Sequence, residues 1–288
     1  MKILRTGVLL ILLSVLLVVA GGAIGGKSGL KIALGIAVVM NGISYFFSDK
    51  IALASSGAQP VSREQVPRLY EVMERLAGKA RLPMPKLYVI PEEAPNAFAT
   101  GRNPRHASVA VTQGLLELMN DEELEGVIAH ELSHVRNYDI LTSSIAATIA
   151  GAITYLASMG RWAMLFGGFG RDRDDDREGG GFAALLMIFL APFAALLLQL
   201  FLSRTREYSA DQIGARMVGQ PYGLISALQK LGAYNQRIPT TSLSPSTSAL
   251  CIVKPFFGSG TLSSLFSTHP PLEKRIQALR EMTVTPQR

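Results

Sequence analysis

Five consecutive residues near the middle of the chain, His130-Glu131-Leu132-Ser133-His134, carry the clearest chemistry in the sequence. On a helix, residues i and i+4 lie one above the other, so His130 and His134 point to a common location. Two imidazoles placed in this way can bind Zn²⁺, and Glu131 beside them can shuttle a proton of a water at the metal. The alternative is an ordinary amphipathic helix with two hydrogen-bonded histidines. Because the chain has only four histidines, two at this spacing favour the metal site.

A second pair of side chains offers the further ligand that a catalytic zinc site requires. Such a site uses three protein ligands and leaves a fourth position for water. Glu207 is the candidate, and it stands four residues before Asp211 on an expected helix, so the two carboxylates share a face. One can bind the metal, while the other accepts the second ring N–H of a ligating histidine. The alternative is two solvated carboxylates beside arginines, which is common on helix surfaces.

The helix that carries the two histidines is predicted to begin after Asn120. Asn120 and Glu123 form a capping-box pattern, and the acidic residues 121–123 complement the positive end of the helix dipole. Leu124, Val127 and Ile128 recur at helical spacing and indicate a buried face. Gly126 lies one turn before the first histidine, where a glycine costs about 1 kcal/mol relative to alanine, so close packing against another backbone is expected there.

The composition is that of a membrane protein. Hydrophobic residues make up 48% of the chain and charged residues only 17%. Four uncharged apolar runs, at 7–26, 32–48, 140–160 and 179–203, approach or reach the roughly 17–25 residues of a spanning helix. The first run has the alternative of a cleaved secretory signal, but a second run follows closely, so we expect it to be retained. The net charge of +6 favours attraction to anionic lipid headgroups. The sequence has no nucleic-acid-binding motif, so nucleic acid is not an expected partner.

Several motifs together resemble the HtpX-type membrane zinc metalloproteases. They are HELSH at 130–134, REYSAD at 206–211 after two long apolar runs, NAFATG at 96–101, and STHPPLEKRI at 267–276. CAAX prenyl proteases and mitochondrial inner-membrane quality-control peptidases are more distant kin. The resemblance implies one Zn²⁺ per chain with His130, His134 and Glu207 as ligands, Glu131 as catalytic glutamate, and Asp211 as the hydrogen-bond partner of His130.

The same resemblance implies an α+β membrane protein. Its mostly helical, zincin-type catalytic domain would contain a small β-meander and be joined to four transmembrane helices. Residues 1–48 would form the first transmembrane hairpin and 140–203 the second, with a polar loop at 171–178. Residues 49–139 and 204–288 would be the two halves of the catalytic domain. Neither half holds every zinc ligand, so the two halves must fold together.

The soluble part is predicted to hold one further helix and three short strands. Ser62 with Gln65 suggests a capping box and a helix over 63–81. Strands are expected at 86–90, 96–101 and 107–112, with a turn at 101–104. Residues 107–111 are the candidate edge strand, where Ala110 would pair with an extended substrate, although a plain structural strand is an equal alternative. Asn96 is a candidate substrate-binding residue or a turn-forming one.

Three further predictions concern stabilisation of the oxyanion, a surface histidine and a long loop. By resemblance, His269 approaches the metal and stabilises the oxyanion, with Tyr208 as a rival. The alternative for His269 is a local hydrogen bond at a helix start. His106 is interpreted as a surface turn residue, and residues 239–268 as a long loop near the site.

The distribution of positive charge and the resemblance together predict the orientation in the membrane and the substrates. Lys and Arg residues are somewhat more frequent on the side of the spans that carries the zinc motif, which favours a cytoplasmic catalytic domain. The resemblance agrees and implies a multi-pass protein of the bacterial inner membrane that degrades misfolded membrane proteins under stress. Two other functions stay open: a membrane scaffold with a closed structural zinc, and a prenyl-protein protease.

Overall fold

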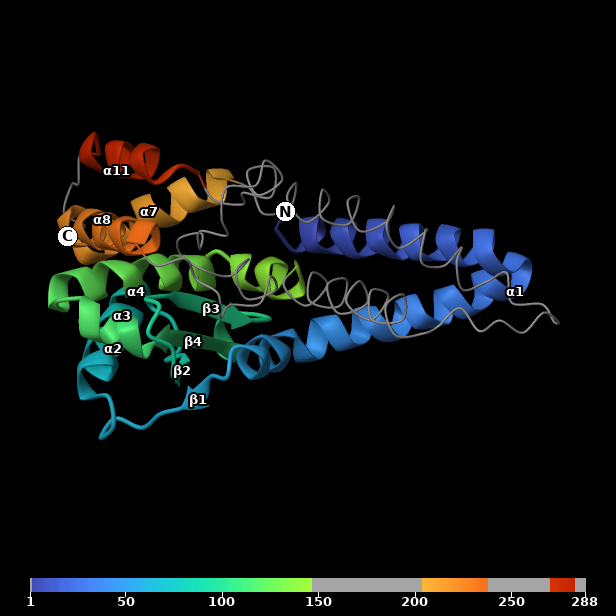
Figure 1. Cartoon of the computed structure of the whole chain (residues 1–288), viewed down its shortest axis with the longest axis horizontal. Helices are drawn as coiled ribbons and strands as arrows, with labels where there is room; N and C mark the ends of the chain where they lie inside the picture. Colours follow the sequence, from blue (N-terminus) through green and yellow to red (C-terminus); the bar gives the residue numbers. More distant parts are fainter. Residues whose placement is uncertain (1, 147–203, 238–269, 283–288) are drawn as a thin grey trace.

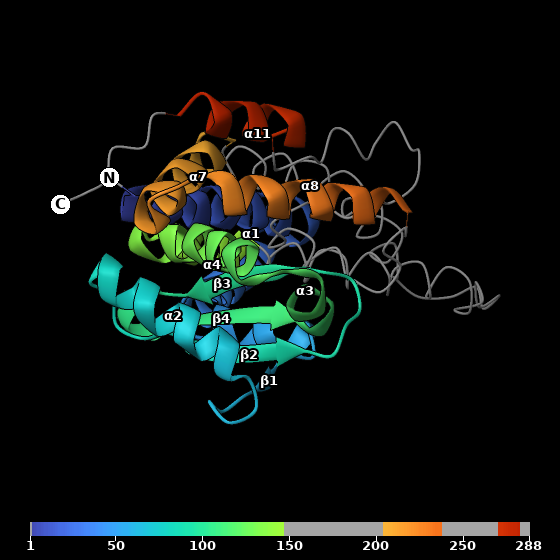
Figure 2. The same ribbon diagram turned by 90° about the vertical axis from the view of Figure 1, so that its left-hand side faces the viewer.

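The computed structural model describes residues 2–146, 204–237 and 270–282, and it combines a long helical hairpin with a mixed α/β region (Figures 1 and 2). The hairpin is α1 (Lys2–Ser55). The strands are β1 (Gln59–Pro60), β2 (Lys86–Ile90), β3 (Ala97–Gly101) and β4 (Ala107–Thr112). The remaining helices are α2 (Pro67–Ala80), η1 (Pro104–His106), α3 (Gln113–Leu118), α4 (Asp121–Arg136), α7 (Arg204–Val218), α8 (Tyr222–Arg237) and α11 (Leu272–Arg280).

Helix α1 is a hairpin because it breaks at Gly25 and Gly26. Gly26 has φ +56, a left-handed conformation that glycine adopts without strain, and the chain then returns alongside itself (Figure 1). The two legs approach closely, since a Cβ built on Gly21 would lie 2.4 Å from that of Ala33. Asn41 Nδ2 also donates to Ser14 Oγ across the hairpin at 2.8 Å. The sequence prediction of two neighbouring apolar helices agrees with this arrangement.

The apolar surface of α1 suits a membrane. Within the described residues, Gly25–Ser55 is the one helix that is long and apolar enough to cross a bilayer by length and composition. Large side chains on it are exposed, such as Ile32 at 64% and Val38 at 65%. The predicted spans at 140–160 and 179–203 lie outside the described residues, apart from 140–146, which are helical.

The sheet has the strand order β1-β2-β4-β3 and is not the predicted meander. Strand β2 pairs parallel with β4, while β3 pairs antiparallel with β4 and β1 antiparallel with β2. After β2 the chain passes to the far edge, forms β3, and returns through η1 to place β4 in the middle. The prediction of 107–111 as an edge strand was therefore wrong. All six residues of β4 are buried, which suits a central strand that is covered on both faces.

Helix α4 is the central element, and it packs against α2, β3, α7 and α8 (Figure 2). Its predicted start is confirmed, because the side chains of Asn120 and Glu123 each accept a hydrogen bond from the other residue's backbone N–H. Gly126 meets α8 backbone to backbone, as expected: a Cβ there would lie 2.5 Å from the nitrogen of Leu224. The histidine-bearing face of α4 thereby turns toward α7.

Helix α2 begins later than the sequence predicted. Ser62 N–H does donate to Gln65 Oε1 at 2.8 Å, but this bond closes a turn rather than a helix start. The helix begins at Pro67, whose fixed φ suits the first helical position. The core under the sheet is built from α2, α4 and the inner faces of the strands, and includes Leu69, Leu76, Val109, Leu124 and Ile128.

Candidate metal centre

The two histidines of α4 present their Nε2 atoms to one point. These atoms are 3.2 Å apart, although the ring planes are nearly perpendicular. His130 is 1% exposed, and His134 is partly buried. The i, i+4 spacing on a regular, capped helix is sufficient to produce this geometry.

Helix α7 brings the third oxygen donor to the same point. Glu207 Oε2 is 3.6 Å from His130 Nε2, and its Oε1 is 3.6 Å from His134 Nε2. One ligand atom from each of the three residues lies within 4.8 Å of the other two. Gly214 permits this close approach, because a Cβ at that position would lie 3.0 Å from the nitrogen of His130.

These donors fit a zinc ion. Zinc–nitrogen bonds of 2.0–2.1 Å at tetrahedral angles separate two nitrogens by about 3.3 Å, close to the separation of the two Nε2 atoms. Each ring is also held through its other nitrogen. His130 Nδ1 lies 2.8 Å from Asp211 Oδ1, and His134 Nδ1 lies 3.5 Å from Asp139 Oδ2. Such carboxylates fix the tautomer that leaves Nε2 available to the metal.

Glu131 stands beside the donors but is held by the sheet. Its Oε2 accepts a hydrogen bond of 2.8 Å from Ala99 N–H, which faces outward from the edge strand β3. Burial raises the pKa of the Glu131 carboxyl above its ordinary value. A buried carboxyl of raised pKa, fixed next to a metal centre, can take up and release a proton.

Asp211 is held in turn by Arg275 of α11. The guanidinium donates from Nε to Oδ2 at 2.8 Å and from Nη2 to Oδ1 at 2.7 Å. Burial raises the pKa of Asp211, but Arg275 and His130 together outweigh it and leave that pKa below its ordinary value. Burial also lowers the pKa of His130, while Asp211 and Glu207 raise it to about 9. Metal binding at this ring must therefore displace a proton.

Comparison with known proteins decides the family. The model described as "Peptidase family M48" matches residues 62–283. The chain belongs to peptidase family M48. "Protease HtpX homolog" of Desulfatibacillum aliphaticivorans is 54% identical, over 96% of this chain and 88% of the relative. The homolog of Pyrococcus furiosus is 49% identical, over 97% of this chain and 96% of the relative. This M48 chain is therefore a membrane metalloprotease that uses zinc.

A solved structure shows the same fold at lower similarity. The crystal structure of S. mikatae Ste24p aligns with a TM-score of 0.52 at 21% identity. The match covers 86% of this chain and 57% of that one. At this identity the likeness concerns the fold alone.

The structure gathers most, but not all, of the residues predicted for the M48 site. His130, Glu131, His134, Glu207 and Asp211 lie together as described above. His269 lies outside the described residues, as does the polar loop predicted at 171–178. Tyr208 is partly buried on α7.

The two residues proposed from the strands to bind substrate are both buried, and the role of Asn96 stays a prediction. Ala110 is fully buried, and β4 is paired on both sides, so it offers no free edge. Asn96 is 5% exposed and joins β3 to β4 through Thr112, whose Oγ1 accepts from Asn96 N–H at 2.8 Å. His106 is exposed on η1, with Nδ1 2.9 Å from Asn103 Oδ1, as expected of a turn residue.

Sequence reasoning missed two charged partners of the M48 site. Arg275 belongs to the STHPPLEKRI motif, but no local sequence pattern indicates that its side chain is buried. Asp139 follows His134 by five residues, beyond a break in the helix at Tyr138, which has φ +59. Helical spacing alone could not place it against the histidine, because the intervening residue leaves the helical conformation.

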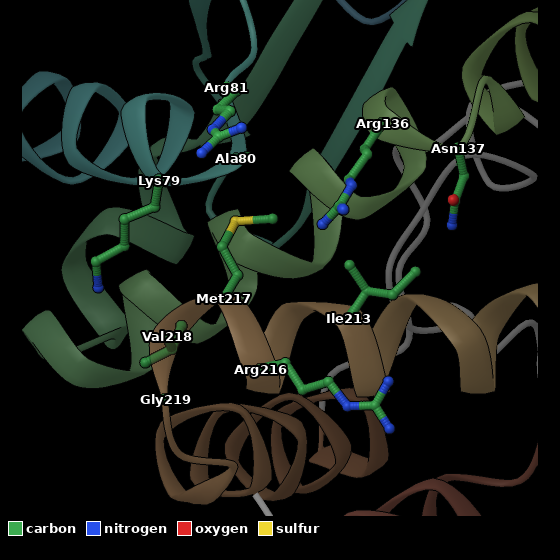
Figure 3. Close-up of a pocket in the computed structure, with 10 residues that line it drawn as sticks. All are labelled: Lys79, Ala80, Arg81, Arg136, Asn137, Ile213, Arg216, Met217, Val218 and Gly219. Carbon is green, nitrogen blue, oxygen red and sulfur yellow. The ribbon is translucent and has the colours of Figure 1, made fainter. Parts of the chain in front are cut away.

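A separate cavity of about 780 Å³ lies where α2, α4 and α7 end (Figure 3). Its charged lining consists of Lys79, Arg81, Arg136 and Arg216, all of which are exposed. Cations at helix C-termini are stabilised by the negative end of the helix dipole, so no bound anion is required to explain them. None of the candidate zinc ligands lines this cavity.

Proposed function

We propose that this M48 protease is an endopeptidase whose single zinc ion is bound by His130, His134 and Glu207. The convergence of these three donors, with the Glu131 carboxylate held beside them, carries the proposal. Zinc, when bound, acidifies a coordinated water and polarises the scissile carbonyl. Glu131 accepts the proton of the attacking water and delivers it to the leaving amine. Asp211 keeps His130 in the tautomer that binds through Nε2. His269 is proposed as donor to the developing oxyanion.

The proposal is tested by Glu131→Gln, which removes the proton acceptor and preserves side-chain size. We expect the variant to retain one zinc per chain and to lose cleavage by at least about 100-fold, the contribution of a general base. Glu122→Gln is the matched control, since it removes an exposed carboxylate of the same helix and leaves cleavage unchanged. Equal activity of Glu131→Gln and the wild type would exclude this role.

We further propose that the substrates are misfolded or partly extracted membrane proteins. His134 lies six residues before the apolar run that starts at 140, and Glu207 lies four residues after the run that ends at 203. At 1.5 Å per helical residue, Glu207 on α7 would sit roughly 6 Å from the end of its run, so the metal would lie near the lipid headgroups. The cleavage assay should therefore compare one membrane protein in folded and unfolded form, beside a prenylated CAAX peptide. Preferential cleavage of the prenylated peptide would overturn this substrate class.

The proposed topology has four spans and a cytoplasmic catalytic domain in the bacterial inner membrane. Residues 1–48 and 140–203 are the two transmembrane hairpins, and 49–139 with 204–288 form the catalytic domain. The exposed apolar surface of α1 supports the first hairpin.

Cysteine labelling tests this topology in a Cys251→Ala background. Asp174→Cys, in the loop 171–178, should react with a membrane-impermeant maleimide from the periplasmic side. Glu122→Cys, on α4, should react only after the membrane is opened. The reverse pattern would place the catalytic domain outside the cytoplasm.

A further inference from the structure

Arg275 is the largest side chain that is fully buried within the described residues. It is 1% exposed and reaches from α11 into the layer between α7 and α4. Its two nitrogens bind both oxygens of Asp211, and Nη1 lies 3.8 Å from Oε2 of the ligand candidate Glu207. A guanidinium fork facing a carboxylate in this way is rigid as well as strong. The fork therefore fixes the carboxylate that fixes His130.

The helix that supplies Arg275 depends on docking for its structure. Helix α11 has nine residues, too few to be stable alone in water, and its N-cap Pro271 makes no side-chain cap. Residues 238–271 separate it from α8 in the sequence. Apart from the arginine, it is held by Leu279, Leu272 and Ile276, which pack on α7 and α8. The contact with Asp211 joins this small helix to the metal centre.

We propose that Arg275 is a positioning residue that couples the docking of α11 to zinc binding. The path has two contacts, from Arg275 to Asp211 and from Asp211 to His130 Nδ1. With α11 docked, Asp211 is held in the orientation that aims His130 Nε2 at the metal. Because coupling between two binding events is reciprocal, bound zinc must favour the docked helix by the same factor. The inference rests on the proposed zinc ligands.

A purely structural arginine would behave differently. It would stabilise the fold whether or not zinc is present, and zinc would not change the exposure of α11. The coupling makes a prediction that a structural role does not, namely that zinc protects α11 and that this protection requires the arginine fork.

Four variants separate the effect of the arginine's charge from that of its fork geometry and from that of the helix itself. Arg275→Met keeps a long buried side chain without charge, and Arg275→Lys keeps the charge without the fork. Arg280→Met is the matched control, because it removes an exposed arginine of the same helix. Arg275→Met leaves the buried Asp211 carboxylate without its guanidinium partner and risks misfolding. The double variant Arg275→Met with Asp211→Asn removes that charge and keeps an acceptor for His130.

The experiment measures zinc affinity by chelator competition, and amide hydrogen exchange over 272–280 with and without zinc, in the full-length protein in detergent. We expect zinc to bind about 10- to 100-fold more weakly to Arg275→Met, and the double variant to bind no more weakly than Asp211→Asn alone, because the arginine acts through Asp211. Arg275→Lys should fall between Arg275→Met and the wild type, and Arg280→Met should match the wild type. Zinc should slow amide exchange over 272–280 in the wild type and in Arg280→Met. It should not slow exchange in the variants that lack the guanidinium fork.

Wild-type zinc affinity in the Arg275 variants, with undiminished protection of 272–280 by zinc, would overturn the coupling. Glu207→Gln distinguishes this failure from a failure of the proposed centre. If Glu207→Gln also binds zinc as tightly as the wild type, the ligand assignment is wrong. If only Glu207→Gln weakens binding, the centre is right and Arg275 does not act on it.

Discussion

The two histidines proposed as zinc ligands have unequal partners at Nδ1. Asp211 lies 2.8 Å from His130 and is itself held by Arg275, whereas Asp139 lies 3.5 Å from His134, at the outer limit of a hydrogen bond. The nearer carboxylate orients its ring more firmly and makes Nε2 more basic. The two halves of the centre are thus supported to different degrees.

This inequality predicts a ranking of two conservative variants. Asp211→Asn should weaken zinc binding by about 10- to 100-fold, the usual cost of losing a carboxylate behind a ligand. Asp139→Asn should cost about tenfold or less, because the lost contact is long. Chelator competition measures both, with the exposed Glu273→Gln as control. Equal losses of zinc affinity in the two variants would show that the carboxylate–histidine distances do not determine how firmly each ring is held.

Among individual residues, the sequence predicted the pairs of side chains that lie on one face of a single helix. The pairs His130 with His134 and Glu207 with Asp211 follow from i, i+4 spacing, and the structure places each pair on one helix face. Arg275 joins the same site from a segment 64 residues beyond Asp211. No periodicity links them, so only the packing of α11 could reveal the contact.

Among the elements, the contact between α4 and α8 depends on the absence of a side chain at Gly126. A Cβ there would lie 2.5 Å and 2.8 Å from backbone atoms of Leu224, which cannot move aside as a side chain could. Gly78 on α2 offers the opposite case, because a Cβ there meets nothing within 4 Å.

Gly126→Ala and Gly78→Ala should therefore change stability in opposite directions. Gly126→Ala should destabilise by about 1–3 kcal/mol through overpacking, and should weaken zinc binding because α4 must shift. Gly78→Ala should stabilise by up to about 1 kcal/mol through helix propensity. Thermal unfolding in detergent measures both changes. An unchanged melting temperature for Gly126→Ala would mean that the helices separate at little cost.

The strand segments were predicted well, but their order was not. The three runs at 86–90, 96–101 and 107–112 are close to β2, β3 and β4. Sequence-adjacent strands usually pair, which favoured a meander. The uncharged run Ala107–Thr112 fits equally well at an edge or in the middle of a sheet, whereas the structure buries all six of its residues and places it in the middle.

For the whole molecule, the proposed zinc site joins two parts of the chain that are far apart in sequence. His130 and His134 precede residues 147–203, and Glu207 follows them. A ligand that binds only the folded arrangement stabilises it by an amount set by its concentration relative to Kd. In the proposed site, bound zinc would close a long loop and hold α4 against α7.

Removal of zinc should accordingly lower the melting temperature of the whole protein. At a zinc concentration 1,000 times Kd the stabilisation is about 4 kcal/mol, which corresponds to roughly ten degrees for a protein of this size. Differential scanning fluorimetry in detergent, with and without a chelator, measures the shift. His134→Ala should melt near the chelated wild type and should not respond to chelator, because it lacks a ligand. If chelator does not change the melting temperature of the wild type, the metal does not join α4 to α7. The proposed zinc site between the two helices would then be wrong.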